Sequence, residues 1–592
     1  MPPHGNDETA RAPRSHRRRW IFLALLIVVG VVAYWPALRS DYLLDDYLHA
    51  AMIDGTYPVQ RGPLDLYNFV NEGDRAVLTA RGLLPWWSHP DLTIRFFRPL
   101  SSALLWADHR VLGRGPLLLH LHSFLWWVAV VLAASALYRR LLPDRPARIA
   151  TFIFALSPSH ALPLAWLANR EALVSLSFGL LAIGAYLRAR EERSRRHAAL
   201  AALLFALSMS GGEYALCSAG YVLAYEILRR HDSLIRRAAG LLPFALPAAA
   251  YLAVRASLGY GTRGSGFYTD PFRDPREFLL GAPRRVITLL AQGWLTFDTD
   301  ALRSSTPWWI LAALLIGALA LLVAPLRRTF ADLDAPTRRA ASWLLLGSLL
   351  SLGPVLAVVP SPRLLGASTL GIAAVVALLL ERAWFPPAPE ERRGLPELMQ
   401  VAALALGFVH LVHGPGSTWL TGRHYRITSE AFAAEARDLR RRLGDSWDGD
   451  ASRADVVVLR GMGGSFFMPF AIQPNGVSPE RWRILAMTGH VLAMRRDART
   501  LDLVAPRDQS VFPSGAGNLF RDQRSPMRVG ESFDLGGMRV TILDVGPAGP
   551  RALRCVVDRD IESAHLAWLT ETAEGFPAAT VPKVGFGQPF DP

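Results

Sequence analysis

Eleven apolar runs, each close to the length needed to cross a bilayer, constrain this sequence more than any other feature. A membrane helix needs about 20 apolar residues, because the hydrocarbon core offers no partner to an unpaired backbone N–H or C=O group. The runs are residues 20–38, 118–137, 148–166, 171–188, 197–211, 213–229, 239–256, 308–325, 341–359, 364–382 and 397–413. Segment 279–296 is shorter and carries Arg284 and Arg285, so it is expected to be interfacial or re-entrant. The sequence therefore predicts a polytopic α-helical membrane protein of about eleven spans.

The orientation of the spans follows from arginine, which supplies almost all of the basic charge because Lys583 is the only lysine. With a cytoplasmic N-terminus, every second loop is basic, as the positive-inside rule requires. The arginines of these predicted cytoplasmic loops are residues 139, 140, 145, 148, 188, 190, 193, 195, 196, 229, 230, 236, 237, 327, 328, 338, 339, 382, 392 and 393. The net charge of +14 thus lies in short patches between apolar runs, which argues against a nucleic-acid-binding surface.

The same count divides the chain into three regions. Residues 1–19 are expected to be a disordered cytoplasmic leader, and 20–413 a transmembrane region with large outer loops at 39–116 and 258–308. Residues 414–592 are expected to form an extracytoplasmic, β-rich, sandwich-like domain that begins with a helix at 430–443. The segments 456–459, 483–486 and 539–543 have the composition of strands and are separated by turn residues. These features predict a multi-pass protein of the cytoplasmic (inner) membrane.

Three acidic positions on the predicted outer side are candidates for chemistry. Asp45 and Asp46 follow the first span, where two adjacent carboxylates suggest a general base, a metal ligand or a group that awaits a cationic partner. An ordinary solvated acidic turn is the alternative. Glu213 lies in the short turn after Gly211 and Gly212, which keeps its carboxylate near the membrane surface.

Basic and histidine side chains on the same side are candidates for binding an anionic headgroup. Arg98, beside Phe96 and Phe97, has a guanidinium that matches phosphate oxygens, although simple snorkelling to lipid headgroups fits it equally well.

Within the turn of the hairpin 148–188, His160 and Arg170–Glu171 are ionisable groups in or beside hydrocarbon, where such groups tend to be functional. The alternative is a buried structural histidine and capping by Asn169. Arg363, in a tight turn before 364–382, is either a phosphate ligand or an interfacial anchor.

Other signatures of catalysis are missing from the sequence. It contains no phosphate-cradling glycine loop, no His-Glu-x-x-His helix and no nucleophile elbow. No nucleotide or redox cofactor is therefore indicated, and the use of a divalent metal is left open.

These motifs, in this order, resemble the type-C membrane glycosyltransferases, nearest the transmembrane O-mannosyltransferase branch and its bacterial relatives. The resemblance covers residues 20 to about 385. It rests on the acidic pair 45–46, the Arg-Pro-Leu-Ser-Ser stretch 98–102, the hairpin with His160, Trp166, Arg170 and Glu171, and the turn that begins at Arg363. Ser157 stands where that branch typically has the first histidine of the hairpin, and the β-rich tail replaces its tetratricopeptide array.

The resemblance implies an inverting transfer of a sugar from a polyprenyl-phosphate donor to a glycan, lipid or protein acceptor on the outer face of the membrane. It implies that Asp45 or Asp46 is the general base. Arg98, His160, Arg170 and Arg363 would surround the donor phosphate, and Glu171 and Glu213 would give acidic support. A non-catalytic relative, transporter or flippase for lipid-linked glycans is the alternative. The apolar middles of the spans favour an interfacial enzyme, since a transporter needs charged or broken helices at the midplane.

Overall fold

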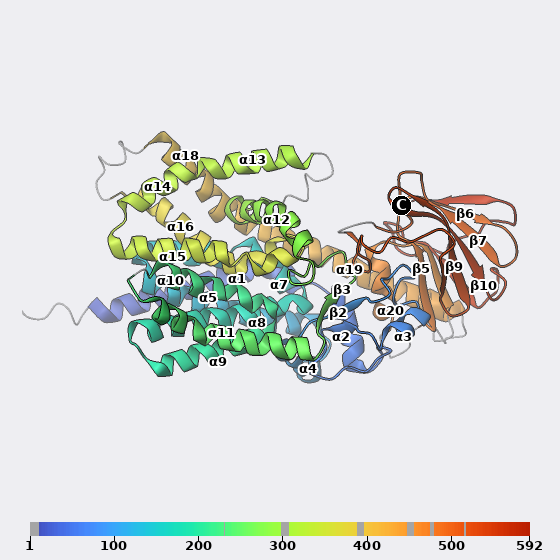
Figure 1. Cartoon of the computed structure of the whole chain (residues 1–592), viewed down its shortest axis with the longest axis horizontal. Helices are drawn as coiled ribbons and strands as arrows, with labels where there is room; N and C mark the ends of the chain where they lie inside the picture. The colour runs from blue at the N-terminus through green and yellow to red at the C-terminus, as the bar shows by residue number, and fades with distance from the viewer. Residues whose placement is uncertain are drawn as a thin grey trace, which may run out of the picture.

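A computed structural model of the chain describes residues 11–229, 231–297, 307–386, 396–446, 455–473, 479–513 and 517–591. It consists of a helical bundle and a β-rich C-terminal domain, with the first long loop lying between them (Figure 1).

The helices of the bundle and its loops are α1 (Arg11–Leu38), α2 (Asp45–Asp54), α3 (Arg75–Ala80), α4 (Pro99–Val111), α5 (Pro116–Leu141), α6 (Asp144–Ala155), α7 (Ala161–Ala165), α8 (Glu171–Glu191), α9 (Arg195–Gly211), α10 (Leu216–Leu228), α11 (Leu234–Ser257), α12 (Pro275–Leu295), α13 (Trp308–Leu321), α14 (Val323–Asp332), α15 (Ala335–Leu350), α16 (Gly366–Trp384), α18 (Glu397–Phe408) and α19 (Gly414–Ser446). Short 3₁₀ turns precede several of them, namely η1 (Pro158–His160), η2 (Leu167–Arg170), η3 (Glu213–Ala215), η5 (Pro354–Ala357) and η6 (Pro362–Leu365).

Eight helical segments within the described residues are long and apolar enough to cross a membrane, at 17–38, 116–141, 167–191, 234–257, 308–332, 335–357, 362–384 and 397–444. They confirm the prediction of a polytopic helical protein and coincide with eight of the predicted runs. The other three runs correspond to the shorter helices α6–α7, α9 and α10, which pack within the same bundle.

Two expectations about these segments need correction. The run 148–166 is not one helix: α6 ends at Ala155, and the chain turns through η1, where Ser157 caps the turn and Pro158 cannot continue the hydrogen bonding of α6. Residues 11–19 of the expected disordered leader are helical, because α1 begins at Arg11. The remainder of the leader lies outside the described residues. Segment 279–296 corresponds to the single helix α12, which ends at Leu295 and is only partly buried.

The basic loops lie together at one end of the bundle. Ion pairs join Arg145 to Glu381 at 3.1 Å and Arg190 to Asp232 at 3.0 Å. Others link Arg382 to Asp332 at 2.9 Å and Arg140 to Glu191. This is the end opposite the C-terminal domain (Figure 1), so the alternation of basic loops is seen in three dimensions. Which compartment each end faces stays a prediction.

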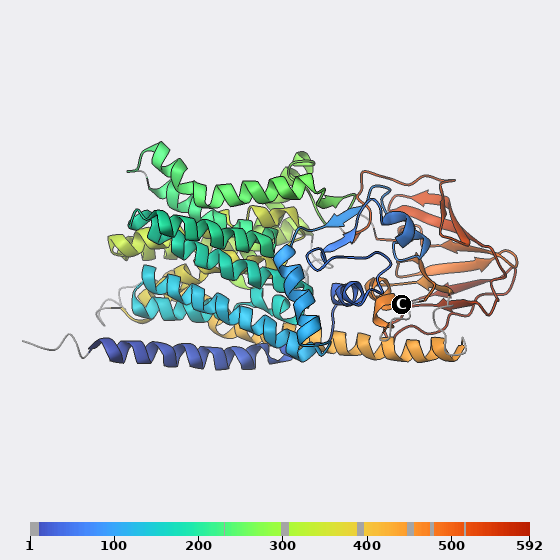
Figure 2. The same cartoon turned by 90° about the horizontal axis from the view of Figure 1, so that it is seen from below.

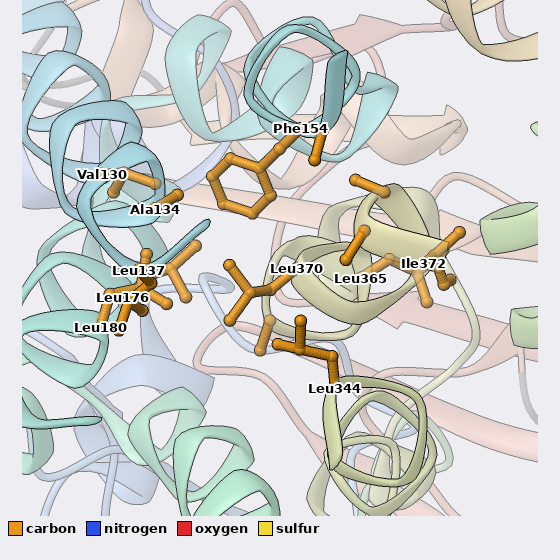
Figure 3. Close-up of a cluster of buried hydrophobic side chains, with 14 of the residues drawn as sticks. Val130, Ala134, Leu137, Phe154, Leu176, Leu180, Leu344, Leu365, Leu370 and Ile372 are labelled. Atoms are coloured by element: carbon orange, nitrogen blue, oxygen red, sulfur yellow. The ribbon is translucent and has the colours of Figure 1, made fainter. Parts of the chain in front are cut away.

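Helix α16 forms the centre of the bundle, and nearly all of its residues are buried. Leu370 of α16 points toward Phe154 of α6 and toward leucines of α8 and α15, whereas Ile372 lies on the other side of α16 (Figure 3). Close packing depends on small residues, as is usual between membrane helices. A Cβ on Gly371 would lie 2.1 Å from the Leu344 carbonyl oxygen, so α15 and α16 could not approach as they do with a larger residue.

The expected helix at 430–443 is the far end of a longer element. Helix α18 continues through a π-helical turn (Val409–His413) directly into α19, which runs to Ser446. This helix packs beside α1 and then extends along the C-terminal domain (Figure 2). The two regions of the chain are therefore joined by continuous helix at residue 414.

The C-terminal domain consists of two sheets and the short helix α20 (Met468–Ala471). A six-stranded antiparallel sheet has the order β12-β6-β7-β10-β9-β8, and a three-stranded sheet with parallel neighbours has the order β11-β4-β5. The strands are β4 (Asp455–Arg460), β5 (Arg481–Ala486), β6 (Val491–Arg495), β7 (Thr500–Val504), β8 (Ser532–Asp534), β9 (Met538–Gly546), β10 (Gly549–Val557), β11 (Leu566–Leu569) and β12 (Gly587–Phe590). The predicted strands 456–459, 483–486 and 539–543 lie within β4, β5 and β9.

A third, smaller sheet joins two loops at the domain end of the bundle, which we define as the end nearest the C-terminal domain. The first loop (residues 39–115) supplies β1 (Asn68–Val70) and β2 (Thr93–Arg95). The second loop (residues 258–274) supplies β3 (Gly261–Arg263), which pairs antiparallel with β2. This pairing brings the second loop alongside the chain that leads into Arg98.

Candidate active site at the domain end of the bundle

The adjacent acids at the start of α2 have different environments. Asp46 is 2% exposed, and its carboxylate accepts N–H groups from Ala168 at 2.7 Å, Leu43 at 3.0 Å and Leu167 at 3.3 Å. Asp45 is partly exposed, and among the described residues no other residue donates a hydrogen bond to it. Asp46 is thus committed to holding α2 against η2, whereas the Asp45 carboxylate is available.

Burial nevertheless perturbs both acids. It raises the pKa of Asp45 to about 6, against the opposing charges of Arg363 and Arg98. It raises the pKa of Asp46 to about 7, although three backbone N–H groups act in the other direction. Asp45 is therefore a carboxylate whose pKa lies close to neutral pH, as general bases require.

A strained residue sets the direction of the acidic pair. Leu44 has φ 47° and ψ −114°, a backbone conformation that a leucine rarely adopts. Such residues cluster at functional sites, where the surrounding structure holds them in place. Here the turn at Leu44 starts α2 so that Asp46 is fully buried while Asp45 stays partly exposed.

Arg98 lies at the centre of a second cluster of charged side chains and pairs with two carboxylates. Its Nε lies 3.0 Å from Glu213 Oε2, and its NH1 lies 3.5 Å from Glu171 Oε1. Its guanidinium also stacks on Phe96 and Tyr67, at 4.6 and 5.0 Å from the ring centroids. Burial alone would lower the pKa of Arg98, but the two carboxylates outweigh this and the pKa lies above its usual value. The predicted acids Glu171 and Glu213 are thus brought together by one arginine.

Gly212 lets this cluster close. A Cβ on Gly212 would lie 2.5 Å from Glu171 Oε2 and 3.4 Å from Arg98 Nε, so any side chain there would displace the carboxylate. The hydroxyl of Ser101, in the first turn of α4, donates to the Gly211 carbonyl at 2.7 Å and fixes the same turn from the other side. The sequence feature Gly211-Gly212-Glu213 is thereby explained as a close approach between α4, α8 and η3.

Arg363 is less constrained than Arg98. Its guanidinium lies over the ring of Trp166, 5.4 Å from the centroid, and no carboxylate within 4.0 Å pairs with it among the described residues. It is close enough to Asp45 and to Glu171 to interact electrostatically with both. Tyr214 positions the turn that carries it, because the Tyr214 hydroxyl donates to the Leu364 carbonyl at 3.3 Å and accepts the Ala367 N–H at 2.8 Å.

Arg170 and His160 are both buried and bonded to groups within the protein. The Arg170 guanidinium donates to Ser123 Oγ and the Leu119 carbonyl, both at 2.8 Å, and forms a buried ion pair with Asp108. These partners occupy all three of its nitrogens. His160 is 1% exposed and is bonded to the Phe154 carbonyl at 3.1 Å. Among the described residues, neither side chain is hydrogen-bonded to or ion-paired with Arg98, Glu171 or Glu213.

Three contributors to the site were not identified from the sequence. Arg255 lies 3.8 Å from Glu213 Oε1, Asp108 neutralises Arg170, and Tyr268 of the second loop lies within electrostatic reach of Asp45, Arg98 and Arg363. Each is distant in sequence from its partners, so no local spacing could indicate it. The sequence evidence for Tyr268 is limited to its position in the loop 258–308, which is predicted to face the same side of the membrane as Asp45.

Within the described part of the chain, no group of three or more His, Cys, Asp or Glu side chains is arranged to hold a metal ion.

No protein-family model matches the sequence, and no curated protein matches it. Solved structures similar to it are the oligosaccharyltransferase AglB from Archaeoglobus fulgidus and ArnT from Cupriavidus metallidurans, both type-C glycosyltransferases. AglB in complex with an inhibitory peptide and a dolichol-phosphate has a TM-score of 0.43 and 13% identity over 78% of this chain and 64% of that chain. ArnT bound to undecaprenyl phosphate has a TM-score of 0.39 and 13% identity over 78% of this chain and 85% of that one.

The chain spans less than two thirds of the AglB structure, 63% for the form tethered with an acceptor peptide.

Proposed function

We propose that this chain is a membrane glycosyltransferase that moves a sugar from a polyprenyl-phosphate donor to an acceptor hydroxyl. The observation that carries the proposal is the relation between Asp45 and Arg363. Each lacks a hydrogen-bonded or ion-paired partner of opposite charge among the described residues, and the two are within electrostatic reach of one another. A carboxylate near neutral pKa and an uncompensated guanidinium are what the displacement of a phosphate from a sugar requires.

In the proposed reaction the acceptor hydroxyl oxygen attacks the anomeric carbon of the donor sugar, and its proton passes to a carboxylate oxygen of Asp45. The bond between that carbon and the phosphate oxygen breaks as the new bond forms. The electron pair leaves with polyprenyl phosphate, whose added negative charge Arg363 stabilises. A single displacement of this kind inverts the anomeric configuration.

The other residues support this pair. Arg98 already binds Glu171 and Glu213, so we assign it to orienting the rim of the site rather than to carrying the donor phosphate alone. His160 and Arg170 hold the hairpin turn behind it. The acceptor is a glycan, a lipid or a protein, and the reaction takes place on the outer face of the cytoplasmic membrane if the basic end of the bundle is cytoplasmic.

The proposal is tested with purified protein in nanodiscs and polyprenyl-phosphate mannose or polyprenyl-phosphate glucose, each radiolabelled in the sugar. We expect Asp45→Asn to lower sugar release by about 100-fold or more while binding of polyprenyl phosphate is retained. We expect Arg363→Gln to weaken that binding. Arg110→Gln is the matched control, because Arg110 is an exposed arginine of the same first loop that stacks on Trp106, away from the site.

Unchanged sugar release in Asp45→Asn would remove the proposed base. Movement of the intact lipid-linked sugar across the bilayer, with no release in any variant, would favour the transporter alternative.

A further inference from the structure

The second loop carries one aromatic residue into the candidate site. The ring of Tyr268 packs edge-on against Phe96, with centroids 5.5 Å apart, next to the aromatic stack on Arg98. Its hydroxyl interacts electrostatically with Arg363, Asp45, Arg98 and Glu213. No hydrogen-bond partner for this hydroxyl exists among the described residues. It is therefore a polar atom with unused hydrogen-bonding capacity inside a cluster of charged groups.

Arg285 holds the residue that follows Tyr268 in the second loop. This α12 arginine donates to the Thr269 hydroxyl at 3.0 Å and to the Leu356 carbonyl in η5. The same two segments are joined by their backbones, since the Thr269 N–H donates to the Ala357 carbonyl at 2.9 Å and Tyr268 forms an antiparallel bridge with Val358. Arg285 thus fastens the second loop to the chain that leads to Arg363.

The C-terminal domain holds the same loop from the other side through residues 518–524. The Gly266 N–H donates to the Asn518 carbonyl, and the Asp522 N–H donates to the Gly264 carbonyl, each at 2.9 Å. Arg524 forms an ion pair with Asp274, at the end of the second loop. The second loop is therefore held by backbone hydrogen bonds near Gly264 and Gly266 and by an ion pair at Asp274.

The segment 518–524 is itself anchored on the first loop. Arg521 Nε donates to the Trp87 carbonyl at 2.6 Å, and the His89 N–H donates to the Phe520 carbonyl at 2.8 Å. Gly264 permits the three chains to meet: it has φ +71°, and a Cβ there would lie 2.5 Å from Cγ of His89. Both loops and the C-terminal domain form one hydrogen-bonded unit around Tyr268.

We infer that Arg285 and segment 518–524 of the C-terminal domain are positioning elements that hold Tyr268 at the site, where its hydroxyl meets a substrate oxygen. This inference rests on the proposed function and assigns to the C-terminal domain a role in assembling the active site. The physical reason is preorganisation: the loop of residues 258–274 would otherwise have to be ordered by the substrate itself, at a cost in rate.

Two readouts test the inference in full-length protein in nanodiscs. The first is backbone hydrogen exchange of residues 264–274, and the second is sugar release with the donor probes used for Asp45. We expect Arg285→Met to raise exchange of this segment about tenfold and to lower turnover by about 10- to 100-fold. Arg285→Lys is expected to recover part of both. Arg284→Met is the matched control, because Arg284 is the neighbouring arginine of α12 and stacks on Trp308 instead of contacting the second loop through Thr269.

Tyr268→Phe separates positioning from packing. We expect it to lower turnover without changing exchange, because it removes only the hydroxyl. If Arg285 acts through Tyr268, the double variant Tyr268→Phe/Arg285→Met should turn over no more slowly than the slower single variant. Fully additive losses would overturn the inference, and so would wild-type turnover in Tyr268→Phe.

The contribution of the C-terminal domain is tested with Asn518→Ala. The Asn518 side chain accepts the N–H groups of Phe520 and Arg521, at 3.0 and 3.2 Å, and so shapes the turn that grips the second loop. We expect Asn518→Ala to raise the backbone hydrogen exchange of residues 264–274.

If Arg285→Met does not fold, Thr269→Val takes its place, because it removes the hydrogen bond between Arg285 and the Thr269 hydroxyl from the other side. If wild-type protein releases no sugar, the proposed function fails, whereas unchanged exchange in Arg285→Met and Asn518→Ala sinks this inference alone.

Discussion

The Ala168 N–H donates a hydrogen bond of 2.7 Å to the Asp46 carboxylate, across 122 residues of sequence. This bond ties the first turn of α2 to η2, which ends at Arg170 and leads directly into Glu171 of α8. It also distinguishes two neighbouring aspartates that look equivalent in the sequence. The Asp46 carboxylate is hydrogen-bonded within the fold, whereas the Asp45 carboxylate remains available for chemistry.

Replacement of Asp46 by asparagine should therefore destabilise the protein. The asparagine amide offers one acceptor oxygen in place of two and turns an NH₂ group toward backbone N–H donors. We therefore expect the free energy of unfolding to fall by about 1–3 kcal/mol. Thermal unfolding in detergent measures it. Asp91→Asn is the control, since Asp91 is exposed and its distance to Arg75 is 3.8 Å. Equal unfolding temperatures for the two variants would contradict the structural role of Asp46.

The pH profile should report Asp45. A general base acts in its ionised form, so kcat/KM is retained above the pKa and falls as the pH is lowered through it. With burial raising the pKa of Asp45 to about 6, the acid limb should be centred near pH 6. The donor is a phosphodiester with no proton to lose in this range, so the titration belongs to the protein. An acid limb at the ordinary value for aspartate, about 4, would mean that the base is a solvated carboxylate.

Arg170 should behave as a structural residue. It and Asp108 are 3% and 7% exposed at the side chain, so removal of one partner leaves a buried charge with incomplete compensation. We expect Arg170→Met to lower stability by about 3–5 kcal/mol. The double variant Arg170→Met/Asp108→Leu should recover part of this loss. A stable Arg170→Met protein that no longer binds polyprenyl phosphate would instead restore the phosphate role that the sequence suggested.

The sequence was most informative where the physics is local. Helices α5, α8 and α16 follow their apolar runs closely, because length and hydropathy alone decide whether a segment can cross a bilayer. The alternation of arginine predicts that the basic loops lie at one end, and the structure has them at the end of the bundle opposite the C-terminal domain. The candidate acids and arginines accordingly converge at the other end.

What the sequence could not resolve depends on contacts made over long separations. The difference between Asp45 and Asp46 comes from the backbone at Leu44 and from the partner at Ala168. Arg170 and Arg363 have the same chemistry, but only Arg170 meets a carboxylate, 62 residues away. The parallel pairing of β4 with β5 and β11 was likewise invisible, because each strand is short and its partner is separated by other elements.

A single methyl group at Gly212 tests whether the Arg98 cluster matters for activity. The new Cβ of Gly212→Ala would sit 2.5 Å from Glu171 Oε2, so the carboxylate must move and with it the guanidinium of Arg98. Overpacking of this kind costs about 1–3 kcal/mol, and displacement of the rim of the site should lower sugar release about tenfold or more.

Gly416→Ala is the matched control for this variant, because Gly416 lies in α19 with no atom within 4 Å of the added Cβ. The control should keep wild-type turnover and unfold at the same temperature or slightly higher, since alanine favours helix. Wild-type turnover in Gly212→Ala would show that Arg98, Glu171 and Glu213 form a structural joint between α4, α8 and η3. The chemistry would then rest on Asp45 and Arg363 without them.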